Sequence, residues 1–312
     1  MEYLKEDSEA HKILFTGLDA AGKTSIILML QRELSKFALL SPTRGAQRRI
    51  FSFLGKSISE WDLGGQENYR IAYLKNPDKY FEGTEITIYV IDILNKDRQD
   101  EALSYLKDVI EQFKKLEIEP PIFVFFHKYD PAIVKTSKNE LDNTSDSIMK
   151  KISKEIKYKK IHYYKTSIYD APSIIKSMSE ILLSLYSRAE LLQKTVEEFA
   201  KKLKAKGAVI IDQNSLIVST FFKDKDTENI IMATTPYFLA LNDSFHKFSN
   251  KSEEEIATSH MVVQRFGEYF IFKEILIEDN SHEYYIILHK EDSEFNNEFF
   301  ETFGNLIQEV LK

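Results

Sequence analysis

The stretch that decides the fold is Gly17-Leu18-Asp19-Ala20-Ala21-Gly22-Lys23-Thr24, which fits the pattern G-x-x-x-x-G-K-[ST]. It lies between a short apolar run, Lys12–Thr16, and an amphipathic segment of helical length, Thr24–Leu34. A turn from a strand into a helix points successive backbone N–H groups into one concavity, and the helix start adds partial positive charge. The sequence therefore predicts a phosphate-binding loop.

The position of each residue in this loop predicts its role. Lys23 is expected to reach the β- and γ-phosphates of a nucleotide, and the Thr24 hydroxyl is expected to bind Mg²⁺. The residues expected to contact the nucleotide at this end are Asp19, Ala20, Ala21, Gly22, Lys23, Thr24 and Ser25.

A second motif, Trp61-Asp62-Leu63-Gly64-Gly65-Gln66, follows the loop at a suitable distance along the chain. Asp62 ends an apolar strand, where its carboxylate can hold Mg²⁺ through water. The Gly65 N–H can contact the γ-phosphate, and the Gln66 amide can orient an attacking water. We therefore assign catalytic roles to Gln66, Lys23 and Gly65.

Two later strand ends carry residues suited to binding a purine base. Phe123–Phe126 runs into His127-Lys128-Tyr129-Asp130, and the Asp130 carboxylate can accept hydrogen bonds from N1–H and N2–H₂ of guanine, a pattern that adenine lacks. The aliphatic stem of Lys128 can cover the base. The strand Ile161–Tyr164 leads to Ser167 and Ile168, whose backbone N–H groups are expected to meet the guanine O6.

Composition excludes several other functions. Formal net charge is −7, from 42 Lys and Arg against 49 Asp and Glu, which disfavours nucleic-acid binding through a global positive field. Because there is no cysteine, disulfides, cysteine-bound zinc and thiol catalysis are excluded. No apolar run is long enough to span a bilayer, and Glu2 stands where myristoylation requires glycine. We expect a cytoplasmic protein that reaches a membrane surface only through a partner.

The chain is predicted to form two domains, 1–187 and 188–312, because 312 residues exceed the usual size of a single hydrophobic core. The first is expected to be α/β, with a mostly parallel sheet and helices on both faces. A hairpin is predicted around Gly55-Lys56, and the expected helices are Lys23–Lys36, Gln99–Lys115, Asp142–Lys157 and Pro172–Ser187.

The second domain is expected to be α+β around one antiparallel sheet. Its predicted order is helix, two strands, helix, three strands, helix. The first helix is placed at Ala189–Lys206 with Gly207 as its C-cap, the second near Pro236–Phe248 and the last at Asn296–Leu311. A turn is predicted at Asp279-Asn280 after the strand Tyr269–Ile277.

These motifs resemble a known family. The loop at 17–24 and the motif at 61–66 are similar to those of the Arf-like branch of Ras-superfamily GTPases. His127 stands where most small GTPases have Asn, in the His-Lys-x-Asp form of the Rag/Gtr family. Thr166-Ser167-Ile168-Tyr169-Asp170 and the Phe53-Leu54-Gly55 turn also resemble that family. The Gln66 motif is closer to its Rag A/B side, and the C-terminal pattern resembles a roadblock/longin-like domain.

The resemblance implies a P-loop GTPase domain followed by a roadblock/longin-like dimerisation domain, with GTP or GDP and Mg²⁺ as ligands. It implies Thr43 as the switch threonine and third magnesium ligand, although Ser41 is an alternative. The His127 side chain is expected to contact the phosphate loop or the purine N7. Implied partners are a second chain, identical or related, bound through the C-terminal domain, together with GTPase-activating, exchange and roadblock-type scaffold proteins.

Two functions remain open. The first is a GTP-hydrolysing switch whose intrinsic turnover is slow, because Arg44, Arg48 and Arg49 have no obvious reach into the phosphate site. The second is a nucleotide-locked scaffold that acts through dimerisation of its C-terminal domain. Retention of Lys23, Thr24, Asp62 and Gln66 together favours the switch.

Overall fold

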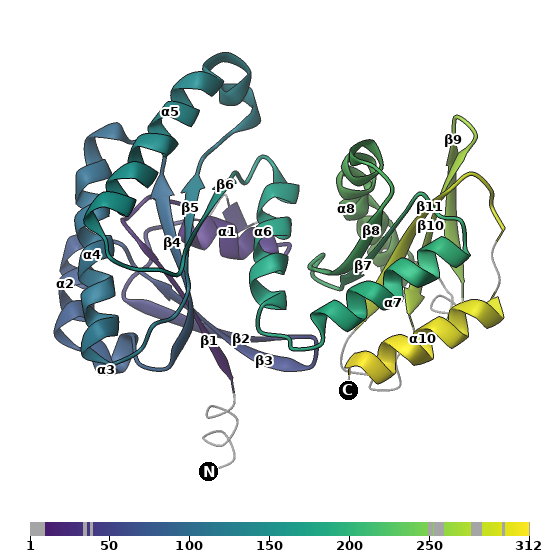
Figure 1. Ribbon diagram of the computed structural model, residues 1–312, viewed down its shortest axis with the longest axis horizontal. Coiled ribbons are helices and arrows are strands. Elements are labelled where there is room, and N and C mark those ends of the chain that lie inside the picture. Colours follow the sequence, from purple (N-terminus) through teal and green to yellow (C-terminus); the bar gives the residue numbers. More distant parts are fainter. Residues whose placement is uncertain are drawn as a thin grey trace, which may run out of the picture. The chain divides into compact units, whose positions relative to one another are not determined.

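The computed structural model describes residues 10–33, 36–37, 40–248, 252, 259–275, 283–294 and 297–311 (Figure 1). The chain divides into two compact units, Met1–Ile174 and Ile175–Lys312. This division falls inside helix α6 (Ala171–Leu183). The last turns of α6 belong to the second unit, where the Ser179 hydroxyl accepts a hydrogen bond of 2.7 Å from the backbone N–H of Ile217. The domain limit at 187/188 stays a prediction.

A six-stranded sheet forms the centre of the first unit, in the order β2-β3-β1-β4-β5-β6. The strand β1 pairs in parallel with β3 and β4, and β5 and β6 continue the parallel arrangement, while β2 is antiparallel to β3. Parallel strands bring their carboxyl ends to one edge of the sheet, where ligands bind in folds of this kind. The strands are β1 (His11–Gly17), β2 (Ala46–Phe53), β3 (Lys56–Leu63), β4 (Thr84–Asp92), β5 (Ile122–His127) and β6 (Ile161–Thr166).

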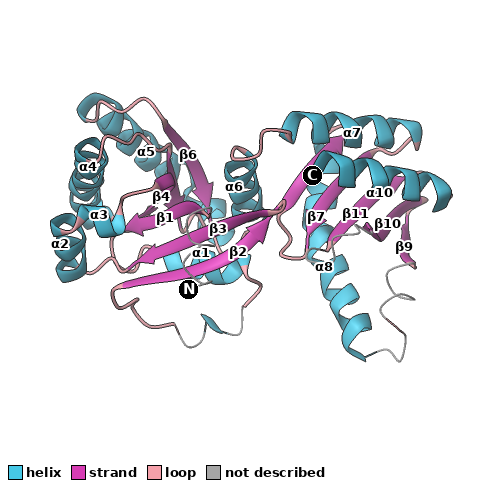
Figure 2. Ribbon diagram, turned by 90° about the horizontal axis from the view of Figure 1, so that it is seen from below, coloured by secondary structure: helices cyan, strands magenta, loops and turns pink. Residues whose placement is uncertain are grey.

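Helices cover both faces of this sheet, as predicted. The helices α2 to α5 lie on one face and α1 lies on the other (Figure 1, Figure 2). The buried side of α4 has the 3–4 residue spacing expected of an amphipathic helix, including Leu106, Val109 and Phe113, and it packs with Val124 and Phe126 of β5. The helical segments are α1 (Lys23–Leu30), α2 (Glu67–Lys75), α3 (Pro77–Tyr80), η3 (Lys96–Arg98), α4 (Gln99–Lys115) and α5 (Pro131–Glu155).

Two helices of this unit differ from their predicted limits. The helix α5 begins at Pro131 rather than at Asp142, because proline needs no backbone N–H partner in the first turn. The chain between these positions is helical up to a break at Ser137, whose φ of −132° interrupts the regular geometry. The helix α1 ends at Leu30, earlier than the predicted Lys36, and Arg32 takes a left-handed φ of 56°.

The second unit is an antiparallel sheet covered by helices on both faces. Its strand order is β8-β7-β11-β10-β9, with α7 and α10 on one face and α8 on the other (Figure 2). This succession of elements matches the predicted α+β order. The elements are α7 (Ala189–Lys202), β7 (Gly207–Asp212), β8 (Ile217–Phe222), α8 (Lys225–Phe248), β9 (His260–Arg265), β10 (Glu268–Ile275), β11 (Tyr284–Lys290) and α10 (Asn297–Leu311).

Two predicted limits in the second unit are wrong. The helix α7 ends at Lys202, and Gly207 opens β7 instead of capping the helix. The chain turns at Lys204, with φ 53°, and the Ala205 N–H donates to the Ala200 carbonyl, a helix-ending arrangement made without glycine.

The helix α8 begins at Lys225 rather than near Pro236, because Asp224 accepts a 2.8 Å hydrogen bond from the Thr227 N–H and caps the helix. The predicted turn at Asp279-Asn280, together with Ile277 and Asn296, lies outside the described residues. Across the described ranges, no helix combines the length and apolar character needed to cross a bilayer.

Candidate functional site

The phosphate-binding loop joins β1 to α1 through backbone conformations that suit glycine. Gly17 and Gly22 have φ of 135° and 100°, a region that side chains rarely adopt. A Cβ atom added to Gly17 would lie 2.4 Å from the Val90 carbonyl oxygen, and one added to Gly22 would lie 2.4 Å from Cδ2 of His127. The loop is therefore pressed against β4 on one side and β5 on the other, which fixes the direction of its backbone N–H groups.

Lys23 opens α1 and lies almost completely buried beneath this loop. Its Nζ donates to the carbonyl oxygens of Gly17 at 3.1 Å and Leu18 at 2.8 Å. Burial lowers the pKa of Lys23 to about 8, whereas the nearby carboxylates of Asp62 and Asp19 act in the opposite direction. An anionic phosphate at this point would raise the pKa of Lys23 and favour its protonated form, so the ammonium group is well placed to bind one.

Three oxygen-bearing side chains meet beside Lys23. The Thr24 hydroxyl donates to Asp62 Oδ2 at 2.6 Å and lies 2.8 Å from the Thr43 hydroxyl, which is itself 3.3 Å from Asp62 Oδ2. Thr43, rather than Ser41, therefore joins the other two predicted metal ligands.

This cluster fits a magnesium ion. Asp62 Oδ1 is buried and has no hydrogen-bond partner among the described residues, which leaves one carboxylate oxygen for a cation or its bound water. Hydroxyl and carboxylate oxygens are hard ligands of the kind that Mg²⁺ takes alongside phosphates and water. Within the described part of the chain, no group of three or more His, Cys, Asp or Glu side chains offers an alternative metal site.

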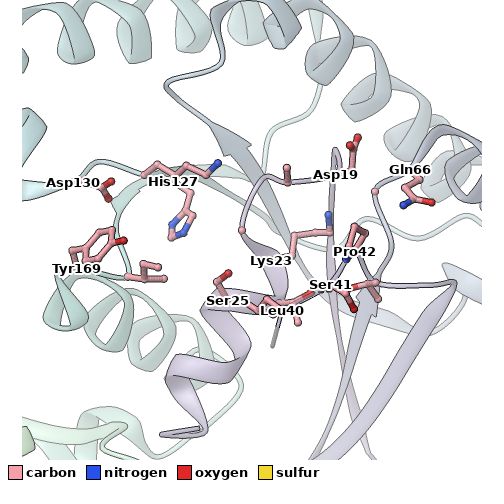
Figure 3. A pocket seen from close by; sticks show the side chains of 17 residues that line it. Asp19, Lys23, Ser25, Leu40, Ser41, Pro42, Gln66, His127, Asp130 and Tyr169 are labelled. Carbon is pink, nitrogen blue, oxygen red and sulfur yellow. Dashed lines mark hydrogen bonds between the residues drawn. The ribbon is translucent and has the colours of Figure 1, made fainter. Parts of the chain in front are cut away.

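Gly65 and Gln66 lie at the same end of the pocket. A Cβ atom added to Gly65 would lie 2.1 Å from the Asp19 nitrogen, so the backbones of the two motifs are in direct contact. Gln66 precedes α2 and lies toward Asp19 and Lys23, at the opposite end from Asp130 and Tyr169 (Figure 3). Both residues therefore lie where the terminal phosphate of a nucleoside triphosphate would be expected.

The other end of the pocket carries the predicted base-binding residues. Asp130 accepts a hydrogen bond from the Ser167 hydroxyl, and Lys128 Nζ donates to Asp92 Oδ2 at 2.7 Å. The Ser167 N–H donates to Ser173 Oγ at 3.1 Å, so this backbone group already has a partner within the protein. This differs from the prediction that the Ser167 N–H meets the guanine O6. Ser167 acts here by holding the Asp130 carboxylate.

His127 takes a structural position beneath the phosphate loop. Its Nδ1 lies 3.0 Å from the Thr166 hydroxyl, and its opposite edge packs against Gly22. Burial, followed by the charge of Lys128, lowers the pKa of His127 to about 4, so the imidazole is neutral at physiological pH. The His127 ring therefore contacts the phosphate loop, as expected, but it does so by packing against Gly22. Its hydrogen-bond partner is the Thr166 hydroxyl.

One pocket of about 480 Å³ collects most of the predicted site (Figure 3). Ala21, Asp62 and Ser167 are not among the residues that line it. Leu40 and Pro42 line it although no role was predicted for them. Tyr169 also lines it, and it belongs to the segment 166–170 whose sequence resembles the base-binding loop of the Rag/Gtr family. The predicted residues on its wall are Asp19, Ala20, Gly22, Lys23, Thr24, Ser25, Thr43, Gly65, Gln66, His127, Lys128, Asp130 and Ile168.

Comparison with known proteins shows the family of this chain. Residues 12–251 match the family model described as the Gtr1/RagA G protein conserved region. The chain belongs to the Gtr1/RagA G protein family. Members of this family are GTP hydrolases that bind GTP and GDP, so the predicted family and enzyme class are confirmed.

Individual relatives of this Gtr1/RagA-family protein include both Rag and Arf-like proteins. It is 27% identical over 215 residues to Ras-related GTP-binding protein A of Dictyostelium discoideum, covering 66% of this chain and 68% of that protein. It is 34% identical over 142 residues to ADP-ribosylation factor-like protein 3 of Chlamydomonas reinhardtii, covering 46% and 75%. A solved structure of the Arl6 BBS3 small GTPase from Trypanosoma brucei with bound GppNp aligns with a TM-score of 0.43 and 16% identity, covering 56% and 96%.

The packing of Gly22 predicts a strong effect of a single methyl group. Replacing Gly22 with alanine should weaken nucleotide binding by at least about tenfold, because the new Cβ strains a backbone at φ 100° and meets the buried His127 ring. Gly55→Ala is the matched control: its φ is 72°, but nothing lies within 4 Å of the added Cβ. Displacement of a fluorescent GDP analogue measures both variants, and equal affinities for the two would contradict the packing argument.

Proposed function

We propose that this protein is a magnesium-dependent GTP-binding switch with slow intrinsic GTP hydrolysis. The observation that carries the proposal is the meeting of Thr24, Thr43 and Asp62 beside Lys23. Thr24, Thr43 and Lys23 line the same pocket as Gln66 and Asp130. Thr43 comes from the connection before β2, so a ligand that binds these groups engages a segment distant from the phosphate loop in sequence. Such a segment can respond to the presence of the terminal phosphate.

The residues divide the chemistry between them. Mg²⁺, held by Thr24, Thr43 and Asp62, would neutralise charge on the β- and γ-phosphates. The Lys23 ammonium binds the same phosphates, and the Gly65 N–H is positioned toward the terminal one. The Gln66 amide orients the water that attacks it, and phosphoryl transfer needs chiefly such positioning and charge stabilisation.

The positions of Arg44, Arg48 and Arg49 support slow intrinsic hydrolysis. Arg48 Nε donates to the Ser59 hydroxyl at 2.8 Å, and Arg49 donates to Gln31. Arg44 is not among the residues that line the pocket. Because an arginine at the transferring phosphate accelerates hydrolysis greatly, we infer that an activating protein supplies this group in trans.

A phosphate-release assay tests the proposal. We expect release from GTP with Mg²⁺, little release after EDTA is added, and little release from ATP. Binding of GTP without any release, even with Mg²⁺, would favour the alternative of a nucleotide-locked scaffold. A preference for ATP would contradict the role of Asp130.

We also propose that the second unit is a roadblock/longin-like module that dimerises with an identical or related chain. Large apolar side chains are exposed on its helix α8, notably Tyr237 at 72%, and in the turn that follows the edge strand β9, where Phe266 is 90% exposed. They border an apolar groove of about 380 Å³, lined by Ile230, Thr234, Tyr237, Phe238, Leu241, Val263, Arg265, Phe266, Glu268 and Phe270. Exposed apolar patches beside an unpaired strand edge are typical of protein interfaces.

Two leucine variants, one in the groove and one on α10, test whether this surface mediates dimerisation. Leu241→Asp should weaken self-association by at least about tenfold, because it places a charge in the groove. Leu306→Asp is the matched control, since Leu306 is 51% exposed against 48% for Leu241 but lies on α10, across the sheet. Light scattering over a concentration series measures the effect. Equal association of both variants and the parent protein would contradict this interface for the homodimer, and a chain that is monomeric throughout would direct the proposal to a related partner.

The remaining predictions concern the cellular setting. Activating, exchange and roadblock-type scaffold proteins are proposed as partners of the switch. A cytoplasmic location with recruitment to membranes through such partners stays a prediction.

A further inference from the structure

Arg98 joins the phosphate loop to the start of α4. Its Nη2 donates to Asp19 Oδ1 at 2.9 Å, while its Nε and Nη2 donate to the two carboxylate oxygens of Glu101 at 2.7 and 3.1 Å. These contacts raise the pKa of Arg98 above its ordinary value and hold the pKa of Glu101 below its ordinary value. One guanidinium group thus bridges a carboxylate that lines the nucleotide pocket and a carboxylate outside it.

A second arginine extends the bridge to α2. Arg70 Nη2 donates to Glu101 Oε1, and its guanidinium lies 5.0 Å from the centre of the Tyr105 ring. Arg70 is buried and belongs to the helix that begins immediately after Gln66. The series Asp19–Arg98–Glu101–Arg70, here called the arginine bridge, therefore connects the phosphate loop with the helix next to the water-orienting residue.

The charge of Asp19 explains why such a bridge is needed. Asp19 lies in the loop that receives the phosphates, and a free carboxylate there would repel them. Arg98 opposes this repulsion by holding one carboxylate oxygen. The Asp19 nitrogen also lies against Gly65, so movement of Asp19 would disturb Gly65 and the adjoining Gln66.

The exposure of the two ion pairs made by Arg98 argues against a role in stability alone. Side-chain exposure is 38% for Asp19, 32% for Arg98 and 39% for Glu101. Pairs exposed to this degree contribute little to folding because water screens them. Their position beside the phosphate site therefore gives them a larger effect on the ligand than on the fold.

We propose that Arg98 is a positioning residue for GTP: it holds the Asp19 carboxylate away from the terminal phosphate and, through Glu101 and Arg70, fixes the segment that carries Gln66. This inference rests on the proposed function. It assigns no direct contact between Arg98 and the nucleotide. GDP, which lacks the terminal phosphate, depends less on the bridge than GTP does.

The test compares Arg98→Ala with Lys107→Ala. Lys107 lies on α4 as well, and its 2.6 Å pair with Glu155 is 44% exposed on both sides and outside the pocket. Arg98→Ala should weaken GTP binding by about tenfold and GDP binding by less than about threefold, and should slow single-turnover hydrolysis by about fivefold or more. Lys107→Ala should change none of these values, and both variants should unfold at nearly the same temperature.

Two further variants separate charge from geometry. Adding Asp19→Asn to Arg98→Ala should restore most of the GTP affinity, because the repelling carboxylate is removed. Arg98→Lys should rescue only part of the effect, since lysine keeps the charge but loses the planar fork that binds two carboxylates.

The outcomes are distinct. If the parent protein binds and hydrolyses GTP, and Arg98→Ala matches Lys107→Ala in its GTP-to-GDP affinity ratio and in hydrolysis, the inference is wrong. Failure of Asp19→Asn to restore GTP affinity would overturn the role of repulsion. A parent protein that neither binds nor hydrolyses GTP would instead overturn the proposed function.

Discussion

Gln66→Leu is expected to slow single-turnover GTP hydrolysis by about ten- to a hundredfold while leaving GTP affinity within about twofold. Gln66 borders the pocket at the Asp19 end, where its amide can orient water, and leucine removes both the donor and the acceptor. The helix α2 should survive the change. The Gln66 side chain makes no capping hydrogen bond, and it is the Gln66 backbone carbonyl that accepts from the N–H groups of Tyr69 and Arg70 at 3.0 Å.

The control for this prediction is Asn68→Leu, which makes a similar polar-to-apolar change on an exposed position of the same helix. Hydrolysis is followed by phosphate release from preloaded GTP, and affinity by displacement of a fluorescent analogue. Normal hydrolysis by Gln66→Leu would show that another group orients the water. Equal slowing by both variants would assign the effect to α2 as a whole.

The predicted site residues that the structure brings together in one pocket belong to contiguous motifs at the ends of strands. Gly17–Thr24 begins at the last residue of β1, and Asp62–Gln66 spans the end of β3, so their placement depends on local chain direction and parallel pairing. His127 is the last residue of β5, and Lys128 and Asp130 follow it, so their placement has the same cause. Alternation of short apolar runs with amphipathic helices was sufficient to predict the parallel sheet.

The parts that were missed depend on contacts between distant segments. Arg98 and Asp19 are brought together because β1 and β4 are neighbours in the sheet, and nothing within 96–98 indicates this. The packing of His127 against Gly22 likewise arises from the fold. The early start of α8 had a local signal in Asp224 and Thr227, but Pro236 was mistaken for the beginning of the helix.

Asp130→Asn is expected to reduce GTP affinity by at least about a hundredfold and to make the protein prefer xanthosine triphosphate. The carboxylate of Asp130 can accept from both N1–H and N2–H₂ of guanine, whereas an asparagine amide presents its NH₂ group as a donor against one of them. Xanthine carries an oxygen in place of the N2 amine, and that oxygen can accept from the new amide. The change therefore reverses one hydrogen bond and leaves the shape of the pocket almost unaltered.

Ser167→Ala distinguishes base recognition from general loosening of this end of the pocket. The Ser167 hydroxyl donates to Asp130, so its loss should weaken GTP binding by about two- to tenfold without changing the preference for guanine over xanthine. Competition between GTP, xanthosine triphosphate and ATP for a fluorescent GDP analogue measures this preference. If Asp130→Asn still selects GTP over xanthosine triphosphate, the carboxylate does not recognise the N1–H and N2–H₂ edge. If Ser167→Ala itself acquires the xanthine preference, selectivity depends on the orientation of the Asp130 side chain as much as on its charge.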